Sequence, residues 1–146
     1  MQINFTGERM LTQFTDSIFL LTLLVTLVVL QALIATGAHR KQTEYIPGVV
    51  DDKLDHFSFV FRSHRTFLNS LENVPVFILT AFLAMFAGID ATTLYWTVMV
   101  FLIARVIHMV LFYKIATNKN PSPRSYFYMI ALLAQVFLLY TTLAAF

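Results

Sequence analysis

Four polar residues recur at helical spacing in an otherwise apolar part of the chain. They are separated by steps of three, four and three residues: Arg62, Arg65, Asn69 and Glu72. On a helix these steps return to nearly the same azimuth, so two guanidinium groups, an amide and a carboxylate share one face. Such groups are costly in a bilayer unless they pair with one another or hold a ligand. This face is therefore the first candidate for a functional site.

The composition indicates that the surroundings of this face are a membrane. Of the 146 residues, 58% are hydrophobic and 12% are charged, whereas a soluble domain carries about 25% charged residues. About 20 apolar residues cross the hydrocarbon core as a helix, so the length allows four spans and no separate soluble domain. The net charge of +2 is too small to suggest a nucleic-acid partner. Because the chain has no cysteine, a thiol reaction must bring its sulfur with a substrate.

We predict an all-α integral membrane protein, a bundle of four transmembrane helices in a single domain over residues 1–146. Gly37 is expected to close the first helix, and Pro75 to remove one backbone hydrogen bond inside the second. Ser122 and Pro123 form a favourable start for the fourth, because serine suits the N-cap and proline the first helical position. The predicted helices span residues 15–36, 54–87, 91–115 and 123–145.

Basic residues predict the orientation of the bundle. They concentrate around the first and third connections between helices, whereas the opposite side carries only Arg9. Since cytoplasmic loops are enriched in lysine and arginine, we expect both polar loops in the cytoplasm and both termini on the non-cytoplasmic side. The bases on the cytoplasmic side are Arg40, Lys41, Lys53, Arg62, Arg65, Lys114, Lys119 and Arg124.

Polar residues from all four predicted helices meet at this cytoplasmic end. The planar fork of arginine suits carboxylates, so a small anion with several carboxylates and one ammonium group matches the arginines and Glu72. The start of the fourth helix offers free backbone N–H groups and a positive dipole end, which stabilise an anion such as a thiolate. Besides the face of the second helix, the group comprises Arg40, Arg105, His108, Arg124 and Ser125.

Motifs in three helices resemble the MAPEG family, the membrane-associated proteins in eicosanoid and glutathione metabolism. The segment 65–75 resembles the family's second-helix signature, and Ala104-Arg105-Val-Ile-His108 is similar to the third-helix pattern of the microsomal prostaglandin E synthase branch. Pro123-Arg124-Ser125 resembles the fourth-helix opening of that branch, and Gly37-x-x-Arg40 fits the end of the first helix. The resemblance covers essentially the whole chain and is closest to the microsomal prostaglandin E synthase and glutathione transferase branch.

The resemblance implies a homotrimer that binds glutathione between subunits near the cytoplasmic face of a bacterial inner membrane or the endoplasmic reticulum. In enzymatic members, an arginine at the start of the fourth helix stabilises the glutathione thiolate, which attacks or reduces a lipophilic substrate. Carried over, this implies that Arg124 stabilises the thiolate with Ser125 as a hydrogen-bond donor, and that Arg105 pairs with Glu72 or a glutathione carboxylate. The implied glutathione-binding residues are Arg40, Arg62, Arg65, Asn69, Glu72, Arg105, His108, Tyr113 and Tyr128.

Two departures separate this chain from the prostaglandin branch. Phe112 stands where that branch has a tyrosine four residues after the histidine, and the loop from there to Arg124 is a few residues longer. Tyr113, next to Phe112, is a candidate to supply the missing hydroxyl. Both departures leave open whether this chain shares the substrate of that branch.

Structural roles stay open for the same residues. The polar face of the second helix is also explained by an ion network that ties helices together, and Arg62 by snorkelling to headgroups. Arg105 and His108 equally suit packing roles, and Arg40 and Arg124 suit anchoring at the membrane surface. No metal site is predicted, because His39, His56 and His64 lack a metal-ligand spacing with acids or cysteines.

We therefore expect a glutathione transferase, peroxidase or isomerase whose partners are glutathione, a lipophilic electrophile and membrane lipids. One alternative is a non-catalytic lipid-binding scaffold of the same fold. Another is a small transporter, for which we expect a charge within the first helix. The segment 17–35 contains none.

Overall fold

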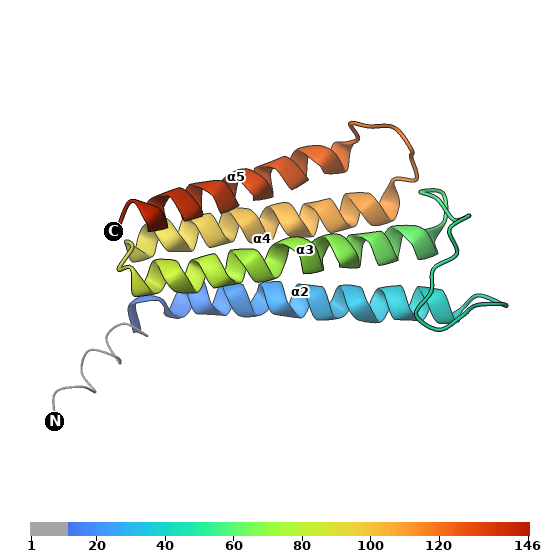
Figure 1. The fold of residues 1–146 in the computed structure, drawn as a ribbon, viewed down its shortest axis with the longest axis horizontal. Coiled ribbons are helices and arrows are strands. Elements are labelled where there is room, and N and C mark those ends of the chain that lie inside the picture. Colours follow the sequence, from blue (N-terminus) through green and yellow to red (C-terminus); the bar gives the residue numbers. More distant parts are fainter. Residues whose placement is uncertain (1–11) are drawn as a thin grey trace, which may run out of the picture.

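The computed structural model describes residues 12–146, which form four long helices packed side by side (Figure 1). Each helix is long and apolar enough to cross a membrane. The prediction of an all-helical chain with four candidate membrane spans is confirmed. The helices are α2 (Thr15–Arg40), α3 (Phe59–Phe86), α4 (Ala91–Lys114) and α5 (Pro123–Leu143).

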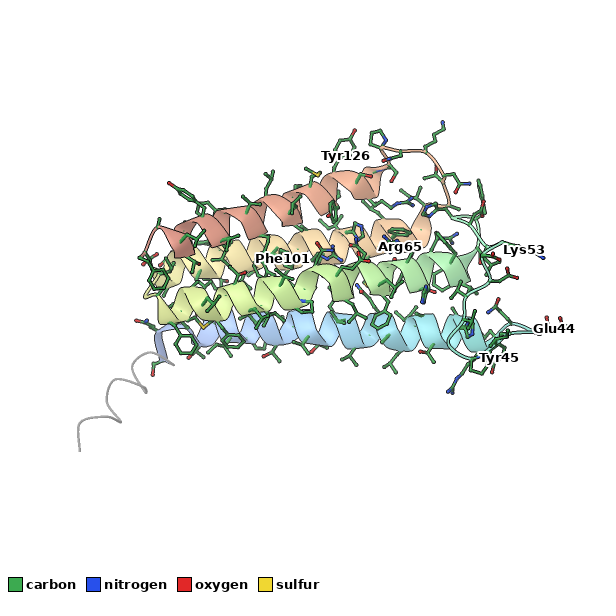
Figure 2. The ribbon with its side chains drawn as sticks, viewed as in Figure 1. Glu44, Tyr45, Lys53, Arg65, Phe101 and Tyr126 are labelled. Carbon is green, nitrogen blue, oxygen red and sulfur yellow. The ribbon has the colours of Figure 1, made fainter. Side chains whose placement is uncertain are left out.

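The two polar connections, segments 41–58 and 115–122, lie together at one end of the bundle, which we call the polar end (Figure 1). The short α3–α4 turn and the end of α5 lie at the opposite end. Glu44 and Lys53 mark the polar end in Figure 2. Every helix therefore has one terminus at the polar end, and residues far apart in the sequence meet there.

The end of the first helix differs from the sequence prediction. Gly37 does not close it, because α2 continues to Arg40. A single glycine costs a helix interior only about 1 kcal/mol, and Gly37 lacks the positive φ that ends a helix. That conformation occurs at Gly88, with φ of 75°, where the N–H groups of Gly88 and Ile89 bond back to the carbonyls of Met85 and Ala84. The extension of α2 places Arg40 in its last helical turn.

The second helix begins later than predicted, at Phe59 rather than at residue 54. The reason is local, because the Asp55 side chain accepts the backbone N–H of Phe57 at 2.9 Å and forms a turn ahead of the helix. The start of α5 agrees with the prediction. Ser122 is its N-cap, and the side chains of Ser122 and Ser125 form a reciprocal capping box.

Two interhelical contacts in the middle of the bundle fix how α3, α4 and α5 face one another. The rings of Phe77 and Phe101 are buried and stack with centroids 3.7 Å apart and planes 9° apart. Gln135 of α5 donates to the Thr80 hydroxyl of α3 at 3.0 Å. Hydrogen bonds between helices in membranes contribute roughly 0.6–2 kcal/mol. These contacts set which side chains of each helix point inward toward the polar end.

Candidate functional site

A buried arginine links α4 to α3 in the polar half of the bundle. Arg105 is 1% exposed, and its Nη1 and Nη2 donate to Asn69 Oδ1 and to Ser70 Oγ, each at 2.8 Å. The expected pairing of Arg105 with Glu72 is not found. Asn69 and Ser70 follow one another on α3 and together accept both ends of the guanidinium fork, so Arg105 is engaged by the protein itself.

Glu72 instead pairs with the other arginine of its own helix. Arg65 Nη1 lies 3.3 Å from Glu72 Oε1, and the two side chains are 46% and 55% exposed. Two helical turns separate them, so both long side chains extend along α3 toward each other; Figure 2 labels Arg65 in the polar half of the bundle. The pair presents a cation and an anion to whatever covers this side of the chain.

Arg62 has a different environment from Arg65. It is buried, and it donates to three backbone carbonyls: those of His56 at 2.8 Å, Phe57 at 3.0 Å and Tyr113 at 3.3 Å. These bonds fasten segment 41–58 and the end of α4 to the start of α3. The single polar face predicted from the sequence is therefore divided, because Arg62 and Asn69 turn toward α4 whereas Arg65 and Glu72 face outward.

The guanidinium of Arg124 contacts two rings at the polar end. Its Cζ is 4.1 Å from the centroid of the Phe112 ring, as in a cation–π contact, and its Nη2 is 3.4 Å from both Nδ1 and Nε2 of His56. In the ring plane, an atom equidistant from both nitrogens would collide with the Cε1 between them. The Nη2 N–H group therefore meets the imidazole from the face of the ring.

Arg124 retains one free donor. Its Nη2 donates to the carbonyl of Thr117 at 3.4 Å, whereas Nη1 is buried and has no hydrogen-bond partner among residues 12–146. Buried polar groups are nearly always hydrogen-bonded, so this N–H direction is a candidate contact for an anion. The position also lies in the first turn of α5, where the helix dipole favours negative charge.

Ser125 has a structural task at the start of α5. Its Oγ accepts the backbone N–H of Ser122 at 3.2 Å, and its own N–H donates to the Ser122 carbonyl at 2.8 Å. A serine hydroxyl that accepts one hydrogen bond still has a hydrogen to donate. Ser125 can therefore keep the cap and donate toward a ligand beside Arg124.

His108 and Tyr128 form the inner side of this region. His108 is buried, its ring centroid lies 5.5 Å from that of Phe112 and 6.5 Å from that of Tyr128, and its Nδ1 has no partner in the described part of the chain. His108 Nδ1 and Arg124 Nη1, which both lack a partner among the described residues, thus belong to side chains that contact the Phe112 ring.

Tyr113 does not take the place of the tyrosine missing at Phe112. The Phe112 ring contacts His56, His108 and Arg124, whereas the Tyr113 ring packs edge-on against Phe59 with centroids 5.5 Å apart. Neighbouring residues on a helix point about 100° apart, so the two side chains face different sides of α4. The hydroxyl of Tyr113 is buried without a hydrogen-bond partner among the described residues.

Arg40 lies apart from the Arg105 and Arg124 groups. It lines a pocket of 390 Å³ between the end of α2, segment 41–58 and the start of α3. His39, Tyr45 and His64 line the same pocket. Within residues 12–146, no group of three or more histidine, cysteine, aspartate or glutamate side chains is arranged to hold a metal ion.

Three contacts at the polar end are not predicted from the sequence. The first is that of His56 with Arg124. From the sequence alone, we consider His56 only as a metal ligand, although its position just before α3 puts it at the membrane level of Arg124. Ser70 as an acceptor for Arg105 carries no sequence signal. The contact between Asn118 Nδ2 and Asp55 Oδ2, at 3.0 Å, joins the two polar connections, and loop-to-loop contacts of this kind have no periodicity to predict them.

The fold and the polar end define a multi-pass membrane protein with an arginine-rich region at one end of four helices. The MAPEG family model matches residues 18–144 of this chain, which therefore belongs to the MAPEG family. No curated protein and no solved structure matches the chain. The family predicted from the three motifs is confirmed, and its closer assignment to the prostaglandin and glutathione transferase branch stays a prediction.

Proposed function

We propose that this protein is a glutathione-dependent membrane enzyme acting on a lipophilic electrophile by conjugation, reduction or isomerisation. The observation that carries the proposal is the Arg124 guanidinium, which contacts the rings of Phe112 and His56 and has a buried Nη1 without a partner among the described residues. Family membership supports a glutathione-related role. Glutathione supplies a thiol whose ionised form is a nucleophile or a reductant.

The residues around Arg124 suit a thiolate. The first backbone N–H groups of α5 have no carbonyl partner within the helix, and they add to the positive end of the dipole. Ser125 offers its hydroxyl hydrogen from the same turn. Together these donors stabilise the ionised sulfur over the thiol, so Arg124 and Ser125 lower the proton affinity of a sulfur held beside them.

The remaining polar groups suit the charged ends of a tripeptide. Arg65 presents a guanidinium fork to a carboxylate, and Glu72 presents a carboxylate to an ammonium group. The Oδ1 of Asn69 is used by Arg105, which leaves an amide donor on Asn69. Arg105 and Arg62 act indirectly in this proposal, because they hold Asn69 and the segment before α3 in place.

A homotrimer explains the exposure of these groups. Arg65 and Glu72 are about half exposed on a single chain, and both lie within the membrane-spanning range of α3. Ionisable groups in a membrane are costly when they face lipid. A neighbouring subunit that covers this side of α3, with glutathione between the two chains, removes that cost and brings a second copy of the Arg40 region near the ligand.

The positive-inside rule places the polar end in the cytoplasm. Lys41, Lys53, Lys114 and Lys119 lie at that end, and Arg9, the base expected on the other side, lies outside the described residues. We propose a bacterial inner membrane or the endoplasmic reticulum as the location, with the substrate entering from the bilayer.

The alternative is a non-catalytic lipid-binding scaffold of the same fold. Two observations favour it. The terminal guanidinium nitrogens of Arg62 and Arg105 donate to protein acceptors, and Phe112 stands where the branch has its tyrosine. The two proposals differ in whether bound glutathione reacts.

Conjugation of glutathione with chlorodinitrobenzene by the purified protein in detergent separates them. The enzyme proposal predicts turnover by the wild type, a loss of about a hundredfold in Arg124→Ala, and no change in Lys119→Ala, which removes an exposed cation from the neighbouring loop. Glutathione binding without turnover of this or of peroxide and epoxide substrates would favour the scaffold. Absence of both binding and turnover would refute the glutathione proposal.

A further inference from the structure

The contact between His56 and Arg124 is not part of the site predicted from the sequence. The Arg124 guanidinium packs on the Phe112 ring of α4 with its Cζ 4.1 Å from the centroid, and its Nη2 donates toward the His56 ring of segment 41–58 at 3.4 Å. The two rings also contact each other, with centroids 5.6 Å apart and planes at 45°, so they lie on adjacent sides of the guanidinium. We call His56 and Phe112 the ring clamp. Because each ring holds a different side of the flat guanidinium, the clamp determines where Nη1 points.

His56 is itself held by several contacts. Its carbonyl accepts from Arg62 at 2.8 Å, and its ring packs edge-on against Phe61 with centroids 4.9 Å apart. The preceding residue, Asp55, accepts from Asn118 at 3.0 Å. His56 is therefore held to α3, and the residue before it to segment 115–122, so the position of the imidazole against Arg124 does not depend on their mutual contact alone.

The charges around His56 favour its neutral form. Arg124 of α5 and Arg62 and Arg65 of α3 oppose a second positive charge here, and only Asp55 favours it. Burial of the ring, followed by the Arg124 guanidinium, lowers the pKa of His56 below its ordinary value of 6.5. A neutral imidazole attracts the guanidinium through its ring face, whereas an imidazolium repels it.

We propose that neutral His56 is a positioning residue that, with Phe112, holds the Arg124 guanidinium so that Nη1 faces the anion site. Protonation of His56 puts two cations in direct contact, and Arg124 then leaves the clamp. The consequence for glutathione rests on the proposed function, whereas the coupling between His56 and Arg124 stands without it. Glutathione binding should therefore weaken on the acid side for a reason separate from the ionisation of its own thiol.

The coupling is tested first without any ligand. NMR titration of the His56 ring protons, assigned with His56→Phe, gives its pKa in the wild type, in Arg124→Ala and in Lys119→Ala. Removal of Arg124 should raise the pKa of His56 toward 6.5, whereas removal of the exposed Lys119 should leave it unchanged. A pKa of His56 that is the same in wild type and Arg124→Ala would overturn the proposal.

The positioning role is then tested by calorimetric glutathione titration between about pH 5 and 8. His56→Phe keeps a ring but cannot gain a charge, so its affinity should fall less steeply with acid than that of the wild type. His56→Ala should bind about three- to tenfold more weakly at neutral pH. The proposal would be overturned if glutathione affinity fell equally steeply with acid in wild type and His56→Phe, or if His56→Ala bound glutathione as tightly as the wild type. If the wild type binds no glutathione, the proposed function fails while the NMR result still decides the coupling.

Discussion

Arg105 of α4 and Asn69 of α3 are joined by a hydrogen bond of 2.8 Å between Nη1 and Oδ1, and Ser70 accepts the second guanidinium nitrogen at the same distance. This places a buried cation between two helices and satisfies both of its terminal nitrogens. It also orients the Asn69 amide, because the oxygen that faces Arg105 leaves the nitrogen on the other side. A residue that resembles a ligand contact in the sequence thus donates to two residues of the protein itself.

Ser70→Ala should destabilise the protein by about 1–2 kcal/mol, because it leaves one nitrogen of the buried Arg105 without an acceptor. Ser63→Ala is the matched control. Ser63 is equally buried on α3, but its hydroxyl bonds only to the Val60 carbonyl of the same helix. Unfolding equilibria in mixed micelles measure both variants, and equal stability losses would contradict the assigned role of the Arg105–Ser70 bond.

Phe112→Leu should lower glutathione affinity and Arg124-dependent turnover by about three- to tenfold, since it removes the ring that lies 4.1 Å from the Arg124 guanidinium. Phe112→Tyr retains the ring and should stay within about twofold of the wild type. Calorimetric titration and steady-state kinetics give both quantities. Loss of activity in Phe112→Tyr as large as in Phe112→Leu would argue against stacking as the function of this ring.

Arg65→Ala and Glu72→Ala should each weaken glutathione binding by about tenfold or more, because each removes a charge matched to one end of the tripeptide. Neither residue is buried in a single chain, so the fold should tolerate both changes. Lys53→Ala removes an exposed charge from the same end and should have no effect. Unchanged affinity in the Arg65 and Glu72 variants would move the binding site elsewhere, even if the activity is real.

Asn118→Ala should raise the pKa of Asp55. The Asn118 amide and then the Phe57 N–H hold that pKa below its ordinary value of 3.8. A carboxyl group whose pKa is lower in the folded than in the unfolded state stabilises the fold at any pH above its unfolded-state pKa. This contribution disappears as the pH falls through the folded-state pKa. Removal of Asn118 should therefore move the pKa of Asp55 toward 3.8 and reduce this contribution at higher pH.

Carboxyl carbon NMR measures this change, with Asp90 as an internal control. Its pKa is also lowered, by hydrogen bonds from Thr93, but it lies at the opposite end of the bundle. A shift in Asp90 as large as that in Asp55 would show a general disturbance rather than loss of the Asn118 bond.

The helices were predictable because their signals are local. Apolar runs of membrane-spanning length, and Ser122 with Pro123, each specify one element without knowledge of the others. The errors at Gly37 and at the start of α3 were also local. A glycine is tolerated within a helix when no left-handed conformation is required there, and the Asp55 turn delayed the second helix by several residues.

Sequence spacing predicts which polar residues lie near the polar end, but not how their side chains pair. Spacing places Arg65, Asn69 and Glu72 on neighbouring azimuths of α3. A rotation of α3 about its own axis by a few tens of degrees nevertheless decides which of these side chains meets another helix. That rotation is set by interior contacts such as Phe77 on Phe101, which single-helix patterns do not contain. The place of His56 depends on contacts from three elements, so it appears only when the chain is folded.

Stabilisation of the glutathione thiolate by Arg124 is tested most directly by the ultraviolet absorbance of the thiolate in bound glutathione as a function of pH. The wild type should ionise the bound thiol about two pH units below free glutathione, whereas Arg124→Ala should return the transition close to that of the free peptide. A wild-type transition at the same pH as free glutathione, or an equal lowering in wild type and Arg124→Ala, would contradict the role given to Arg124.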